Sequence, residues 1–140
     1  MKSLATLIKL YRKRLDDKRL ELLREEELLE ELHKILARIR EEMQSEKAVA
    51  EKSIPASYYF PAYIEQAVNT ERRIESLIAE QQKKIETIQE EIAEEFSELK
   101  KYEILREIKQ QAAVKEEERI EQMQLDEIAT NSFLQGRKEN

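Results

Sequence analysis

The residues able to do acid–base or nucleophilic chemistry are numerous in this chain, but their types and spacing do not form a catalytic group. The one histidine, His33, lies on a charged flank of a helical pattern, where we expect it to be solvated. Carboxylates occur in runs, such as Glu25–Glu27 and Glu41–Glu42, that are typical of the solvated flanks of a coiled coil rather than of an acid/base pair. With no cysteine and one glycine, the chain offers no thiol nucleophile, no thiolate metal site and no phosphate-binding loop. We therefore expect no catalytic, metal or cofactor-binding residue, and a protein that is not an enzyme.

Composition favours one long helical domain. Charged residues make up 40% of the 140, and there is no tryptophan. Such a chain fits a coiled coil better than a globular core. The net charge of −6 argues against nucleic-acid binding. No apolar run is long enough to insert into a bilayer, and the basic residues that follow Leu4–Ile8 do not fit a signal peptide.

Heptad spacing runs through the first part of the chain. Steps of four and three select twelve positions, ten of them apolar, which predicts a coiled-coil seam. They are Leu4, Ile8, Tyr11, Leu15, Lys18, Leu22, Glu25, Leu29, Leu32, Leu36, Ile39 and Met43.

A proline-containing stretch, residues 53–63, interrupts this pattern. Pro55 and Pro61 disfavour a continuous helix, so we expect helix 1 at about 3–52, a connector at 53–62 and helix 2 at about 62–134, with a frayed tail at 135–140. This arrangement is an antiparallel two-helix coiled-coil hairpin, all-α, forming a single domain over residues 1–140. The connector holds four aromatic residues that either plug the closed end or form an exposed contact patch: Tyr58, Tyr59, Phe60 and Tyr63.

The second arm continues the seam and extends beyond the end of the first arm. Its seam positions are Ile64, Ala67, Ile74, Ile78, Gln81, Ile85, Ile88, Ile92, Phe96, Leu99 and Tyr102, with Glu71 and Glu95 interrupting and Leu105, Ile108 and Ala112 extending the stripe. A fold near residue 58 places Lys18 near Glu95, Gln81 near His33 or Lys34, and Leu4 opposite a residue near 111. The last 20 or so residues of the helix then lack an internal partner, over roughly 30–35 Å. Because apolar residues surround this C-terminal overhang, we expect another molecule to enclose it.

At Arg119–Ala129 the sequence resembles the C-terminal signature of the FliJ family of flagellar export proteins. The Arg119, Gln122 and Asp126-Glu127-Ile128-Ala129 spacing carries the resemblance, as do the Tyr59-Phe60-Pro61 connector and shorter matches at the N-terminus. These matches look like the alphaproteobacterial form of the family.

The resemblance implies a cytoplasmic stalk, peripheral to the inner membrane at the flagellar base, that takes part in type III protein export, motility and chemotaxis. It implies that the open end enters the hexameric ring of the export ATPase FliI through Arg119, Gln122, Met123, Asp126 and Glu127. It also implies contact with the export gate protein FlhA, for which the candidate residues are Tyr58, Tyr59, Phe60, Tyr63, Ala67 and Thr70. Family members also escort export chaperones, a role to which we assign no residue.

Three alternatives stay open. The same stalk could serve a virulence type III secretion system, or the seam could be satisfied between two chains of a homodimeric scaffold, whereas the hairpin predicts a monomer. A third is a tether on an anionic membrane surface through the basic N-terminus, which carries Lys2, Lys9, Arg12, Lys13 and Arg14.

Overall fold

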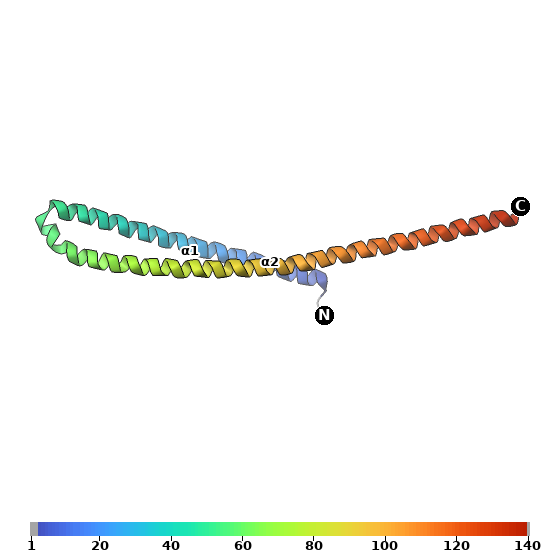
Figure 1. Cartoon of the computed structure of the whole chain (residues 1–140), viewed down its shortest axis with the longest axis horizontal. Helices are drawn as coiled ribbons and strands as arrows, with labels where there is room; N and C mark the ends of the chain where they lie inside the picture. Colours follow the sequence, from blue (N-terminus) through green and yellow to red (C-terminus); the bar gives the residue numbers. More distant parts are fainter. Residues whose placement is uncertain (1–2, 140) are drawn as a thin grey trace. The chain divides into compact units, whose positions relative to one another are not determined.

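The computed structural model describes residues 3–139 and is all-α over that range (Figure 1). Helix α1 spans Leu4–Lys52 and helix α2 spans Ile54–Glu139. The helices form two compact units. The terminal unit comprises Met1–Arg12 and Ser97–Asn140, and the hairpin unit comprises Lys13–Phe96. Within the hairpin unit the chain reverses direction at Ser53, as predicted for an antiparallel hairpin (Figure 1).

The connector is much shorter than the sequence suggested. Only Ser53 separates the helices, so most of the expected 53–62 connector is helical. Ser53 caps α2: its Oγ accepts a hydrogen bond from the Ala56 amide at 3.4 Å, and its carbonyl accepts one from the Ser57 amide at 3.0 Å. Pro55 falls in the first turn, where its missing N–H removes no helical bond. Pro61 lies inside the helix and deprives the Ser57 carbonyl of its usual donor.

The seam of the hairpin unit follows the predicted heptad positions. All nine positions of α1 from Leu15 to Met43 are buried or half-buried. On α2 the most buried residues are Ile78, Gln81, Ile85 and Ile88. Phe96, expected in the seam, is 44% exposed, while the neighbouring Glu95 is half-buried.

Charged contacts between the helices give the antiparallel alignment of the hairpin unit. The guanidinium of Arg40 donates to Glu71 at 3.1 Å and to Glu75 at 2.9 Å. Farther from Ser53, the ammonium of Lys18 donates to the Glu91 carboxylate. Residues nearer the N-terminus of α1 thus pair with residues nearer the C-terminus of α2, as antiparallel helices require.

A polar layer interrupts the apolar seam between these ion pairs. Gln81 is 8% exposed, and its amide donates to the backbone carbonyl of Glu25 at 2.9 Å and also to the Glu25 carboxylate. The expected pairing of Gln81 with His33 or Lys34 is therefore wrong. The chain reverses at Ser53 rather than near residue 58, which moves the α1 partner toward the N-terminus. Lys18 and Glu95 line one shallow groove, although Lys18 bonds to Glu91.

In the terminal unit, α1 covers only part of α2. Ile8 and Leu99 are buried, the rings of Tyr11 and Tyr102 lie 5.3 Å apart, and Arg12 bonds to Glu103 at 3.4 Å. Beyond this point the expected stripe is wrong: Leu105 and Ile108 are exposed, and Arg106 is the half-buried residue. Heptad spacing continues from Leu99 through Tyr102 to Arg106, so the α1-facing position is basic.

From Glu107 to Arg137 every residue of α2 is exposed. We call residues 107–137 the overhang. It is about 45 Å long at 1.5 Å per residue, which is longer than the sequence suggested, because burial on α2 ends at Arg106 rather than near residue 111.

Candidate functional site

The overhang exposes large apolar side chains on all sides of a single helix. Their positions follow no single stripe, since consecutive members are six, six, three, two, three, five and one positions apart. The exposed residues are Ile108, Val114, Ile120, Met123, Leu125, Ile128, Phe133 and Leu134. A helix that packs against one flat neighbour needs one apolar stripe, whereas this pattern suits a partner that encloses the helix.

Arg119 is held in place by its own helix. Its Nε and Nη2 donate to the two carboxylate oxygens of Glu116 at 3.0 and 2.6 Å, and its Nη1 lies 3.1 Å from the sulfur of Met123. The Glu116 carboxylate raises the pKa of Arg119, and the guanidinium lowers the pKa of Glu116. Because the ion pair is exposed, Arg119 can exchange Glu116 for a carboxylate of a partner at little energetic cost.

The predicted ATPase-contact residues gather on the same stretch. Gln122 donates to the Asp126 carboxylate at 3.0 Å, and the Asp126 carbonyl accepts from Thr130 at 2.8 Å. Four of the five predicted residues line one shallow groove together with Ile120 and Gln124: Arg119, Met123, Asp126 and Glu127. Gln122 joins them through Asp126.

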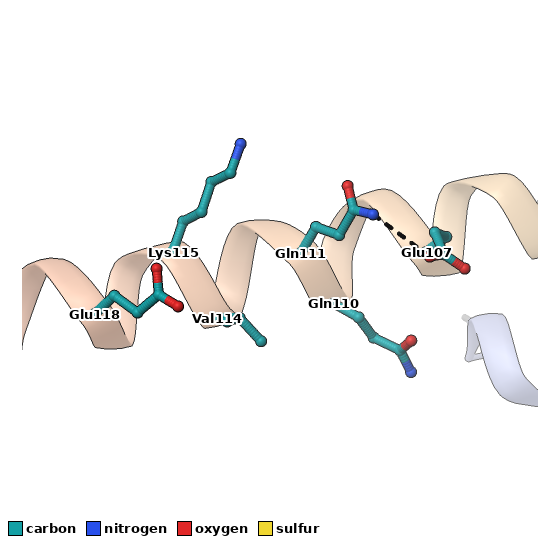
Figure 2. A pocket seen from close by; sticks show the side chains of 6 residues that line it. All are labelled: Glu107, Gln110, Gln111, Val114, Lys115 and Glu118. Atoms are coloured by element: carbon teal, nitrogen blue, oxygen red, sulfur yellow. Dashed lines mark hydrogen bonds between the residues drawn. The ribbon is translucent and has the colours of Figure 1, made fainter.

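A second groove lies near the start of the overhang and was not singled out from the sequence. Figure 2 shows its lining: Gln110 and Val114 point to one side of α2, Lys115 points to the other, and Gln111 donates to Glu107 at 3.4 Å. Glu118 completes the lining. The only sequence signal for it is the isolated Val114 in a polar stretch, which periodicity analysis does not identify as a site.

The closed end of the hairpin unit presents an exposed aromatic surface. Tyr58 and Tyr59 are 79% and 78% exposed, and the adjacent Ile54 is 74% exposed. Phe60 and Tyr63 are half-buried, with ring centroids 6.3 Å apart. Of the two readings of the aromatic connector, Tyr58 and Tyr59 thus fit the contact patch, and Phe60 and Tyr63 partly close the end of the hairpin.

The remaining gate candidates line a groove beside the closed end. Tyr63, Ala67 and Thr70 lie there with Ile39, Glu42 and Gln66. Burial raises the pKa of Tyr63, and the carboxylates of Glu42 and Glu46 raise it further. The hydroxyl of Thr70 donates to the Gln66 carbonyl at 3.0 Å, and the groove is lined by both apolar and polar side chains. The predicted gate residues therefore form two neighbouring sets: Tyr58 and Tyr59 on the exposed surface, and Tyr63, Ala67 and Thr70 in the groove.

Residues 3–139 contain no group of three His, Cys, Asp or Glu side chains that could hold a metal ion. His33 is exposed on α1, as expected for a solvated side chain. Over the same described range, neither helix has a segment apolar enough to cross a bilayer.

Comparison with known proteins gives one clear match. The family model described as flagellar FliJ protein matches residues 1–138. No curated protein and no solved structure matches the chain.

Proposed function

Since the chain belongs to the FliJ family and is thus a component of flagellar type III export, we propose that its overhang enters the hexameric ring of the export ATPase FliI. The observation that carries this proposal is the exposure of apolar side chains on every side of residues 107–137. A bore surrounds a helix and can bury all of these side chains, which a flat surface cannot. Arg119, Gln122, Met123, Asp126 and Glu127 would meet the ring lining, where charge-assisted hydrogen bonds give orientation.

We further propose that the closed end contacts the export gate protein FlhA. Support comes from the exposed Tyr58 and Tyr59 and from the groove at Tyr63, Ala67 and Thr70. Tyrosine is enriched at protein interfaces because its ring buries apolar area and its hydroxyl finds a polar partner. The chain would then act at the flagellar base, peripheral to the inner membrane, by linking ATPase and gate, and it would contribute binding rather than catalysis.

The ATPase proposal is tested by binding to FliI. Removal of residues 112–140 should abolish co-purification with the FliI ring, and Ile128→Glu should weaken it by at least about tenfold, because a carboxylate would be forced into an apolar contact. Leu20→Glu is the matched control, since Leu20 is 48% exposed but lies in the hairpin unit. Binding that survives the truncation would refute the proposal.

The gate proposal has a separate readout. Tyr58→Ala/Tyr59→Ala should weaken binding to the cytoplasmic part of FlhA and leave FliI binding unchanged. Equal FlhA binding by this variant and the parent chain would exclude Tyr58 and Tyr59 from the gate contact. The same result with Ala67→Glu would exclude the groove at Tyr63, Ala67 and Thr70 from that contact.

A further inference from the structure

Two seam positions of α1 in the hairpin unit carry charge. Lys18 and Glu25 occupy positions otherwise filled by leucine, isoleucine or methionine, and their side chains are 32% and 16% exposed. Each has a partner of suitable polarity on α2. Lys18 donates to Glu91, and Glu25 accepts from Lys84 at 3.0 Å and from the Gln81 amide. Both charged layers are therefore satisfied when α1 pairs antiparallel with α2.

A parallel pairing of two copies would have the opposite effect on these layers. In a parallel, in-register coiled coil each seam residue faces its own counterpart. Leu15, Leu22 and Leu29 would bury as well against their counterparts as against α2, so the apolar pattern does not choose between the two arrangements. Lys18 would face Lys18 and Glu25 would face Glu25, and close like charges are strongly unfavourable.

Helix α2 also carries charged residues at seam positions, and these would face like charges in a parallel dimer. Glu71 and Glu95 are half-buried seam positions of α2, and each would also face its own copy. In the hairpin, Glu71 instead accepts from Arg40 at 3.1 Å. Four seam layers thus carry like charges in the parallel dimer, whereas three of these residues have an oppositely charged partner in the hairpin.

We propose that Lys18 and Glu25 are a built-in barrier to parallel self-association, which keeps α1 paired with α2 of its own chain. The partner they exclude is a second copy of this chain. A long two-chain rod would also require one continuous helix through Ser53, where the pyrrolidine ring of Pro55 would clash with the carbonyl of Glu51. The charged layers and Pro55 act in the same direction: the first disfavours side-by-side pairing and the second disfavours the straight helix.

The test compares self-association of full-length variants by light scattering over a concentration series. Lys18→Leu/Glu25→Leu removes both layers and should self-associate at least about tenfold more tightly than the parent chain. Arg19→Leu/Glu26→Leu is the matched control, because it removes the same charges and adds the same leucines at exposed neighbouring positions. Lys18→Glu/Glu91→Lys retains both the hairpin pair and the like-charge layer, and should stay monomeric.

An engineered disulfide between two chains reports whether their α1 helices pair in parallel and in register. The chain has no cysteine, so Leu15→Cys, added to each variant, reports an in-register parallel α1 pair through an intermolecular disulfide. We expect this disulfide in the Lys18→Leu/Glu25→Leu background alone. A monomeric double-leucine variant, equal self-association of the control, or dimers without the Leu15→Cys disulfide would each overturn the proposal, as would a parent chain that forms it.

Discussion

The side-chain amide of Gln81 in α2 reaches across the seam to the backbone carbonyl of Glu25 in α1, at an N–O distance of 2.9 Å. Above and below this layer the seam is mostly leucine and isoleucine, which repeat every three or four residues and so bury similar areas in several registers. The hydrogen bond between Gln81 and Glu25 can form in only one of these registers.

The first prediction is that this layer fixes the register and lowers stability. In Glu25→Leu/Gln81→Leu the free energy of unfolding should rise by about 1 to 2 kcal/mol, since well-packed apolar residues replace a buried polar pair. Denaturant unfolding measures this change. Arg40 pairs with Glu71 and Glu75, and Glu25 pairs with Lys84, which places Leu36 opposite Ile74. A disulfide between Leu36→Cys and Ile74→Cys therefore reports the native register, and one between Met43→Cys and Ile74→Cys reports a slip of one heptad. The slipped disulfide should form only in the double-leucine variant, and its formation in the parent chain would contradict a register role.

A second prediction concerns the apolar seam itself. Leu36 is 6% exposed, and Leu36→Ala should lower the free energy of unfolding by roughly 2 to 3 kcal/mol through lost burial and a residual cavity. Leu23, at 52% exposed on the same helix, is the control, and Leu23→Ala should change it by about 0.5 kcal/mol or less. Equal effects of the two substitutions would be inconsistent with the seam.

The third prediction is a pH dependence centred on Glu25. The Gln81 amide, and then the Lys84 ammonium, lower its pKa in the folded chain below the ordinary value of 4.5. The stabilisation from ionised Glu25 is therefore complete well above 4.5 and is lost as the pH falls from there through the lower folded-state pKa. Unfolding of the parent and of Glu25→Gln should differ by a constant free energy at neutral pH, and the difference should shrink in acid. A difference that does not change between neutral pH and pH 3 would show that Glu25 does not contribute through its charge.

The fourth prediction separates the two prolines. Pro61→Ala restores an N–H donor for the Ser57 carbonyl inside α2 and should stabilise the first turns of that helix by about 2 kcal/mol, after allowing for the greater freedom of the unfolded chain. Pro55→Ala restores no helical bond, because position 55 is in the first turn, and should be neutral or slightly destabilising. Hydrogen exchange of the amides from 57 to 66 reads both effects. Greater protection of these amides in Pro55→Ala than in Pro61→Ala would contradict the prediction that Pro61 is the proline that destabilises α2.

The sequence alone determined the fold class, the seam and the family. Leucine and isoleucine at heptad positions of both arms leave few ways to bury apolar area, and two prolines in one short stretch mark where the chain reverses. For the same reason the seam positions of α1 from Leu15 to Met43 were all correctly assigned. The signature at Arg119–Ala129 identified the family independently of any packing.

Only the tertiary structure decided the register, the end of the seam and the exposure of the aromatic residues. Local sequence cannot show that Ser53 alone makes the reversal, since a proline is disfavoured inside a helix but does not always end it, as at Pro61. That short turn moved the partner of Gln81 to Glu25, and the half-buried position that follows Tyr102 is Arg106 rather than Leu105. Heptad spacing defines the face on which a residue lies, but the residue opposite it depends on where the two helices meet, which is a property of the folded pair.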